Sequence, residues 1–323
     1  MNRWDVNEID DVGLTPLILA ASYGHEEVVK LFLRIKHIQP GRRDANSGRT
    51  ALSWAARHGH EPVVRLFLGP RFVSPEGIGD WWREAARVVG VLFGWRYVNP
   101  DSHSKYGQTP LSLAAENGHE GIVKILLERG DVNPNRYRES TITPLWLAAE
   151  NGHEGVVKLL LERKDVSPNT LSIFYDHTPL SFAAGEGREG VVKLLLGRKE
   201  VNPDSAGRSG RTPLSFAAGE GREGVVKLLL GRKEVNPDSA GISGRTPLSF
   251  AAENGREGIV KLLLAQKEVN PDSSSESGQT PLSWAAGNGH EGIVKLLLGR
   301  KEVDPDSSSE SGKTPLPRMA ARE

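Results

Sequence analysis

TPLSFAAGEGREGVVKLLLGRKEVNPDSAGRSGR, residues 178–211, is the stretch that decides the fold of this 323-residue chain. Its opening Thr-Pro-Leu occurs eight times, at Thr15, Thr109, Thr143, Thr178, Thr212, Thr246, Thr280 and Thr314. Thr50-Ala51-Leu52 is a ninth, altered copy. Neighbouring copies from Thr109 onward lie 34 or 35 residues apart, and a fixed spacing of this size indicates a repeat protein.

The first half of the stretch predicts a short helix followed by a sharp turn. Thr178 can accept a hydrogen bond from a free N–H at a helix start, and Pro179 has the backbone angle of a first helical residue. Ala183 and Ala184 allow close packing against neighbouring repeats. The glycines of 185–187 permit a reversal, so a helix hairpin is predicted.

The second half predicts another helix and then an extended connection. Residues 189–198 carry apolar side chains on more than one side, which indicates a helix covered by both adjacent repeats. Val201-Asn202-Pro203-Asp204 ends that helix because proline cannot continue it. Residues 205–211 are rich in turn formers and lead to the next Thr-Pro.

The pattern Thr-Pro-Leu-x-x-Ala-Ala-x-x-Gly, then Val-Val-Lys-Leu-Leu-Leu and Val-Asn, resembles the ankyrin repeat over nearly the whole chain. The resemblance implies an all-α solenoid of stacked helix-turn-helix units with β-turn fingers. Ser stands where the family often has His after Thr-Pro-Leu, so that residue's inter-finger hydrogen bond is not expected. We expect one domain over 1–323, with units near 1–38, 39–73, 74–98, 99–132, 133–166, 167–201, 202–235, 236–269, 270–303 and 304–323.

Two features depart from the period. The unit at 74–98 is short and degenerate, and we expect it to leave a gap or a bend in the stack. Its tryptophans, Trp81, Trp82 and Trp95, either fill that space or line a pocket. The last unit, 304–323, is partial, so the chain is either a fragment of a longer protein or ends in an improvised cap.

The composition of the chain limits which partners and locations are expected. Lys plus Arg equals Asp plus Glu at 41 each, which argues against nucleic acid as a partner. There is no cysteine and no apolar run long enough to cross a bilayer, so we expect no membrane insertion. We therefore expect an intracellular monomer, in the cytoplasm or the nucleus.

Two patterns imitate catalytic or ligand sites. Residues 185–190 match G-x-G-x-x-G, but a helix rather than a strand is predicted before them, so nucleotide binding is not expected. Five histidines share one turn position, where a hydrogen bond is a simpler role than metal binding: His25, His60, His119, His153 and His290. We expect no enzyme activity, no cofactor and no metal.

Candidate binding residues lie on three consecutive fingers and an adjoining first helix. Arginine and aromatic side chains are enriched at protein interfaces, and these residues bring them together: Lys105, Tyr106, Arg136, Tyr137, Arg138, Trp146, Phe174 and Tyr175. The alternative is that the aromatic rings pack finger against finger. The resemblance implies a concave face of fingers and first helices, so we expect a scaffold or adaptor that binds another protein. The other possibility is a spacer or regulatory arm of a larger signalling protein.

Residues 178–207 and 212–241 are identical, as expected after a recent tandem duplication. We expect the surfaces of these two copies to be near copies as well.

Overall fold

The computed structural model describes residues 5–69, 98–136, 142–172 and 177–305. These residues form sixteen α-helices and no strand, with a single isolated β-bridge between Arg43 and Thr50. The chain divides into two compact units, residues 1–167 and 168–323, which are described in turn. The predicted all-α class is therefore confirmed; the prediction of one domain stays a prediction.

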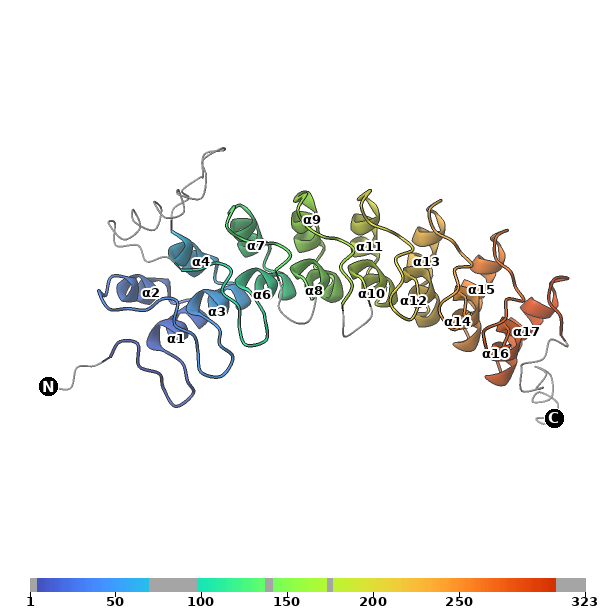
Figure 1. The fold of residues 1–323 in the computed structure, drawn as a ribbon, viewed down its shortest axis with the longest axis horizontal. Helices are drawn as coiled ribbons and strands as arrows, with labels where there is room; N and C mark the ends of the chain where they lie inside the picture. The colour runs from blue at the N-terminus through green and yellow to red at the C-terminus, as the bar shows by residue number, and fades with distance from the viewer. Residues whose placement is uncertain (1–4, 70–97, 137–141, 173–176, 306–323) are drawn as a thin grey trace. The chain divides into compact units, whose positions relative to one another are not determined.

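Unit 1 is a stack of four helix pairs. Their bounds are α1 Pro16–Ser22 and α2 Glu26–Leu33, α3 Ala51–Arg57 and α4 Glu61–Leu68, α6 Pro110–Glu116 and α7 Glu120–Leu127, and α8 Pro144–Asn151 and α9 Glu154–Glu162. The first helix of each pair packs on the first helix of the next, and Figure 1 shows these first helices as one row beside the row of second helices.

Unit 2 repeats this arrangement in four more pairs. Their bounds are α10 Pro179–Gly185 and α11 Glu189–Leu196, α12 Pro213–Glu220 and α13 Glu223–Leu230, α14 Pro247–Glu253 and α15 Glu257–Leu264, and α16 Pro281–Gly287 and α17 Glu291–Leu298. Contacts again join successive first helices and successive second helices. The predicted solenoid of helix-turn-helix units is thus confirmed within each unit.

Each described first helix begins at the threonine of the repeat motif. Thr178 Oγ1 accepts a hydrogen bond from the N–H of Ser181 at 3.1 Å, and Pro179 is the first helical residue. Ser181 Oγ in turn accepts from the N–H of Thr178 at 2.7 Å, which completes a capping box. Ser is therefore used in capping where the family often has His. A threonine cap of this kind stabilises a helix by about 1 kcal/mol.

The turn between the paired helices depends on a glycine in the left-handed region. Gly187 has φ 74°, a conformation that is energetically unfavourable for residues that carry a Cβ. It turns the chain from α10 into α11. Beyond the turn, Val191, Val192 and Leu195 are buried against neighbouring helices. Burying each such side chain contributes about 1.5–3 kcal/mol, so the stack is stabilised chiefly by contacts between repeats.

The fingers are tight β-turn loops joined to one another. In the finger before α6, Ser104 N–H donates to Gln108 O at 2.8 Å and Gly107 N–H donates to Ser104 O at 3.0 Å. Its tip is tied to the preceding finger because Lys105 N–H donates to Ser47 O at 2.8 Å. The predicted β-turn fingers are confirmed by these bonds.

The helix pairs on the two sides of the degenerate segment are in direct contact. α3 lies against α6 and α4 lies against α7. His119 also donates to Arg57 O at 2.9 Å, and Arg129 Nη1 donates to Leu68 O at 3.1 Å. The prediction of a gap between these pairs is therefore wrong, because α6 and α7 form the next layer, and the alternative of a bend stays a prediction. Residues 70–97, with Trp81, Trp82 and Trp95, lie outside the described residues.

Candidate functional site

A pocket of about 300 Å³ opens between the fingers and first helices of unit 1. Fingers supply five of its seven lining residues, and α6 and α8 supply one each. The lining residues are Arg49, Tyr106, Gly107, Gln108, Ser112, Ile142 and Leu147. The pocket thus combines a cation, an aromatic ring, an amide and two aliphatic side chains, a mixture typical of sites that bind by shape and a few polar contacts.

A chain of polar contacts holds one wall of this pocket. Arg49 Nη2 donates to Gln108 Oε1 at 2.6 Å, and Gln108 Nε2 donates to Glu116 Oε2 at 3.1 Å. The Arg49 guanidinium lies 5.1 Å from the centre of the Trp54 ring. Burial lowers the pKa of Arg49, although arginine stays charged. Arg49 is therefore a charged side chain that is already oriented at this wall.

Asp44 supports the same wall from the preceding finger. Its carboxylate accepts hydrogen bonds from Ser47 Oγ at 2.6 Å and from Trp54 Nε1 at 3.0 Å. Burial acts to raise the pKa of Asp44, but these bonds and those from the backbone of Ser47 and Arg49 outweigh it and lower the pKa. Asp44 is thus ionised, and it fixes the indole against which Arg49 rests.

The structure separates the predicted binding residues into four groups, of which the fourth is Trp146 alone. Tyr106 lines the pocket with 69% of its surface exposed, and the neighbouring Lys105 is exposed at the same fingertip. Arg136 lies at the base of the next finger, where its Nη1 is 3.5 Å from Asp101 Oδ2. Tyr137, Arg138, Phe174 and Tyr175 lie outside the described residues.

Trp146 requires a correction. It is only 1% exposed, so its ring belongs to the core and offers no area to a partner. The physical reason is its register: Trp146 is the third residue of α8, and the equivalent Ser112 and Ser181 are buried as well. Its large ring therefore fills the interior of unit 1 at a place where other repeats have a small polar residue.

Sequence reasoning predicted only Tyr106 among the seven lining residues. Arg49, Gln108 and Ile142, which it missed, stand immediately before a repeat threonine, and Leu147 is the fourth residue of a first helix. Aligning the repeats by their threonines shows that the residue before Thr changes from copy to copy, as Arg49, Gln108 and Ile142 do. That variation was the signal that could have identified them.

The histidines bind the turns of successive repeats together. The Nε2 atoms of His60, His119, His153 and His290 each donate to a carbonyl at the end of the preceding first helix, at 2.9 to 3.0 Å. Arg222 and Arg256 do the same through Nε, at 2.8 and 3.2 Å. The predicted hydrogen bond is confirmed for these residues, and it spans two repeats. No group of acidic or histidine side chains within the described ranges could hold a metal ion.

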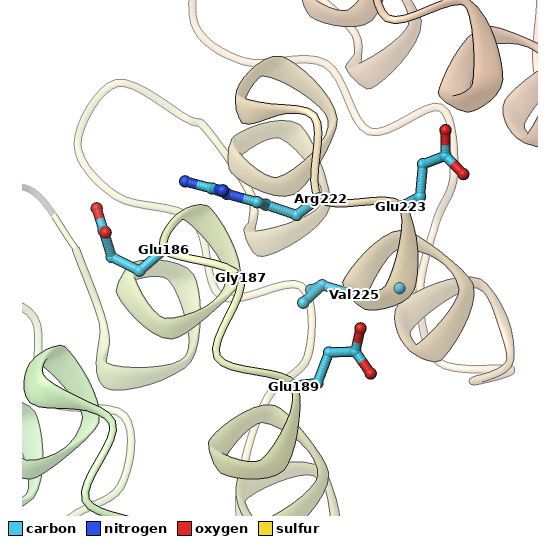
Figure 2. A pocket seen from close by; sticks show the side chains of 7 residues that line it. Glu186, Gly187, Glu189, Arg222, Glu223 and Val225 are labelled. Carbon is cyan, nitrogen blue, oxygen red and sulfur yellow. The ribbon is translucent and has the colours of Figure 1, made fainter.

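A second hollow, of about 180 Å³, lies at the turns of unit 2 beside the G-x-G-x-x-G match. Figure 2 shows Arg222 extending beside the turn that carries Glu186 and Gly187, with Glu189 and Glu223 nearby. Helix α10 leads directly into this turn, as the sequence predicted. Three carboxylates around the hollow would repel a phosphate, so its chemistry disagrees with a nucleotide site.

Among the described helices, none combines the length and apolar character needed to span a bilayer. The comparison with curated proteins found no significant match. A sequence model described as "Ankyrin repeats (3 copies)" matches residues 1–75, 84–172, 166–240 and 231–309. These matches cover most of the chain and coincide with the helix pairs and fingers described above, and the chain therefore belongs to the ankyrin repeat family.

Proposed function

We propose that unit 1 binds another protein through the pocket between its fingers and first helices, as a non-enzymatic scaffold or adaptor. Ankyrin repeats are in general protein-protein interaction modules. The observation that carries the proposal is Tyr106, a large aromatic side chain 69% exposed at a fingertip and at the rim of a pocket. Tyrosine is enriched among residues that dominate binding energy because its ring contributes area and its hydroxyl a hydrogen bond.

The surroundings of Tyr106 favour binding because little has to be ordered. The finger bonds from Lys105 N–H to Ser47 O and from Gly107 N–H to Ser104 O hold the tip before any partner arrives. The Arg49 side chain is likewise held by Gln108 at 2.6 Å. A preformed surface avoids part of the entropy cost of association, which lies near 0.5–1.5 kcal/mol for each side chain that must be immobilised.

The test compares the full chain with Tyr106→Ala in capture of partners from source lysate, with quantification of each captured protein. Removing an interface tyrosine should weaken capture about tenfold or more. Thermal unfolding should be unchanged, because an exposed ring contributes little to stability. Ile242→Ala is the matched control, since Ile242 is an apolar side chain 66% exposed on a finger of unit 2. Equal capture by all three proteins, or a sharp fall in melting temperature for Tyr106→Ala, would contradict the proposal.

The identical copies 178–207 and 212–241 favour a second candidate function, a spacer or regulatory arm of a larger signalling protein. Duplication lengthens an arm without requiring a new surface. Deleting one copy should leave partner capture unchanged under the binding proposal, because the pocket is in unit 1. A spacer should instead have no specific partner to lose, and its deletion should alter only functions that depend on length.

A further inference from the structure

Unit 2 carries a row of stacked rings and cations on the face formed by its fingers and first helices. The fourth residue of each first helix is aromatic: Phe182, Phe216, Phe250 and Trp284. The arginines that stand immediately before Thr212 and Thr246 each lie between two of these rings. Arg211 Cζ is 4.1 Å from the centre of the Phe216 ring and 4.3 Å from that of Phe250. Arg245 Cζ is 4.1 Å from Phe250 and 4.3 Å from Trp284.

The two arginines differ in their anionic partner. Arg245 Nη2 donates to Glu253 Oε2, which lies eight positions further along the chain. The equivalent position for Arg211 is Gly219, which has no side chain. Within the described parts of the chain, the Arg211 guanidinium has no hydrogen-bond or ion-pair partner, and its Nε is buried. Arg211 is thus a half-buried cation with aromatic surroundings like those of Arg245 but without a carboxylate hydrogen-bonded to it.

The electrostatics agree with this geometry. Burial lowers the pKa of Arg211 and the nearby Arg245 lowers it further, whereas Glu220 and Glu253 raise it through space without a hydrogen bond. Arginine nevertheless stays charged in proteins. A guanidinium that has lost part of its hydration, and whose ring neighbours accept no hydrogen bonds, binds a carboxylate more strongly than an exposed one does.

Position 219 supplies no side chain beside Arg211. A Cβ added to Gly219 would lie 3.4 Å from Arg211 Nη2 and 3.6 Å from Phe250 Cβ, both tolerable contacts. In the next repeat, this is the route by which Glu253 reaches Arg245. Because Gly219 supplies no such side chain, a carboxylate for Arg211 would come from outside the chain.

We propose that Arg211, flanked by Phe216 and Phe250, is a binding site for an aspartate or glutamate side chain of a partner protein. The guanidinium donates two parallel hydrogen bonds to the carboxylate, and the rings fix its plane. This site lies in unit 2 and does not depend on the pocket proposed in unit 1. A partner with an acidic segment fits it, whereas the charge of Arg245 is already paired with Glu253.

The experiment measures fluorescence anisotropy of a labelled peptide of Glu-Gly-Leu repeats with the full chain, against a matched Gln-Gly-Leu peptide. The acidic peptide should bind and the amide peptide should bind about tenfold more weakly. Arg211→Gln should weaken binding of the acidic peptide by a similar factor. Raising the salt concentration should also weaken it, since a partly exposed charge is screened.

Gly219→Glu is the decisive variant because it keeps Arg211 and supplies an internal carboxylate in the pattern of Glu253. It should raise the melting temperature and weaken the acidic peptide about tenfold. Glu253→Gln should strengthen binding of the acidic peptide, because it frees Arg245. Equal affinity for the two peptides, or unchanged binding in Gly219→Glu, overturns the proposal. Circular dichroism checks the fold of Arg211→Gln. If Arg211→Gln is unfolded, the binding result for Gly219→Glu tests the proposal by itself.

Discussion

One position at the base of most fingers is occupied by Asn in some repeats and Asp in others, and the two make different bonds. Asn169 Nδ2 donates to Glu200 O at 2.6 Å, and its Oδ1 accepts from Asn202 N–H at 3.0 Å. Asn135 and Asn7 make the same pair of bonds to the following repeat. An asparagine at this position therefore satisfies one donor and one acceptor of the next layer.

Aspartate satisfies only the N–H donor of the next layer. Asp204 Oδ2 accepts from Asn236 N–H at 2.7 Å, but its Oδ1 is buried and has no partner. The same unpaired Oδ1 occurs at Asp101, Asp238 and Asp272. Burial raises the pKa of Asp204, and the bond from Asn236 only partly opposes it. The ionised carboxylate is thus held in an environment that suits an amide better.

We predict that Asp204→Asn stabilises unit 2 by about 1 kcal/mol at neutral pH, the usual net value of one added hydrogen bond. The new Nδ2 should donate to the carbonyl of Glu234, as Asn169 donates to Glu200. For a cooperative unit of about 150 residues, this gain corresponds to an increase of about 2–4 °C in melting temperature, measurable by calorimetry. Asp238→Asn should raise the melting temperature by a similar amount.

The dependence on pH provides the sharper check. Because the folded-state pKa of Asp204 is raised above the unfolded value, the folded state binds the proton more tightly. Lowering the pH through that raised pKa therefore stabilises the wild type, and this contribution is complete below the unfolded pKa. The advantage of Asp204→Asn should shrink as the pH falls toward 4. The reverse change, Asn169→Asp, should destabilise the unit at neutral pH and recover in acid. A destabilised Asp204→Asn, or an advantage that does not change with pH, would refute the reasoning.

Two further predictions concern bonds within and between repeats. His119→Ala should lower the free energy of unfolding by about 1 kcal/mol in urea denaturation, because the bond to Arg57 O is lost. His25→Ala, at an exposed turn, should change it by less than about 0.5 kcal/mol. Thr246→Ala should cost about 1 kcal/mol through loss of the helix cap, since Thr246 Oγ1 accepts from Ser249 N–H. Thermal melting of the same variant, with Thr246→Ser retaining the cap as a control, checks this prediction.

A feature could be predicted from the sequence where the residues that determine it lie close together in the chain. The start of α10 depends on Thr178, Pro179 and Ser181, which are neighbours in the chain, so the helix boundary was predictable. The role of Trp146 was not, because its burial depends on packing between successive first helices. Of the pocket only Tyr106 was predicted, since Arg49, Ile142 and Leu147 come from other repeats and meet it through the three-dimensional register.

The identical copies 178–207 and 212–241 show the same limit, and they correct the expectation that their surfaces are near copies. Phe216 is 8% exposed and lies between Arg211 and His177, whereas its counterpart Phe182 is more exposed and lies against His177 with no arginine over its ring among the described contacts. The difference comes from the residues before and after each copy, because every ring on this face is covered by the adjacent repeat. Gly219 belongs to the duplicated sequence, but its effect is felt by Arg211, just outside it. Duplication in a stacked protein therefore copies the helices but creates new surface wherever a copy meets a different neighbour, and an arginine without its glutamate is one product.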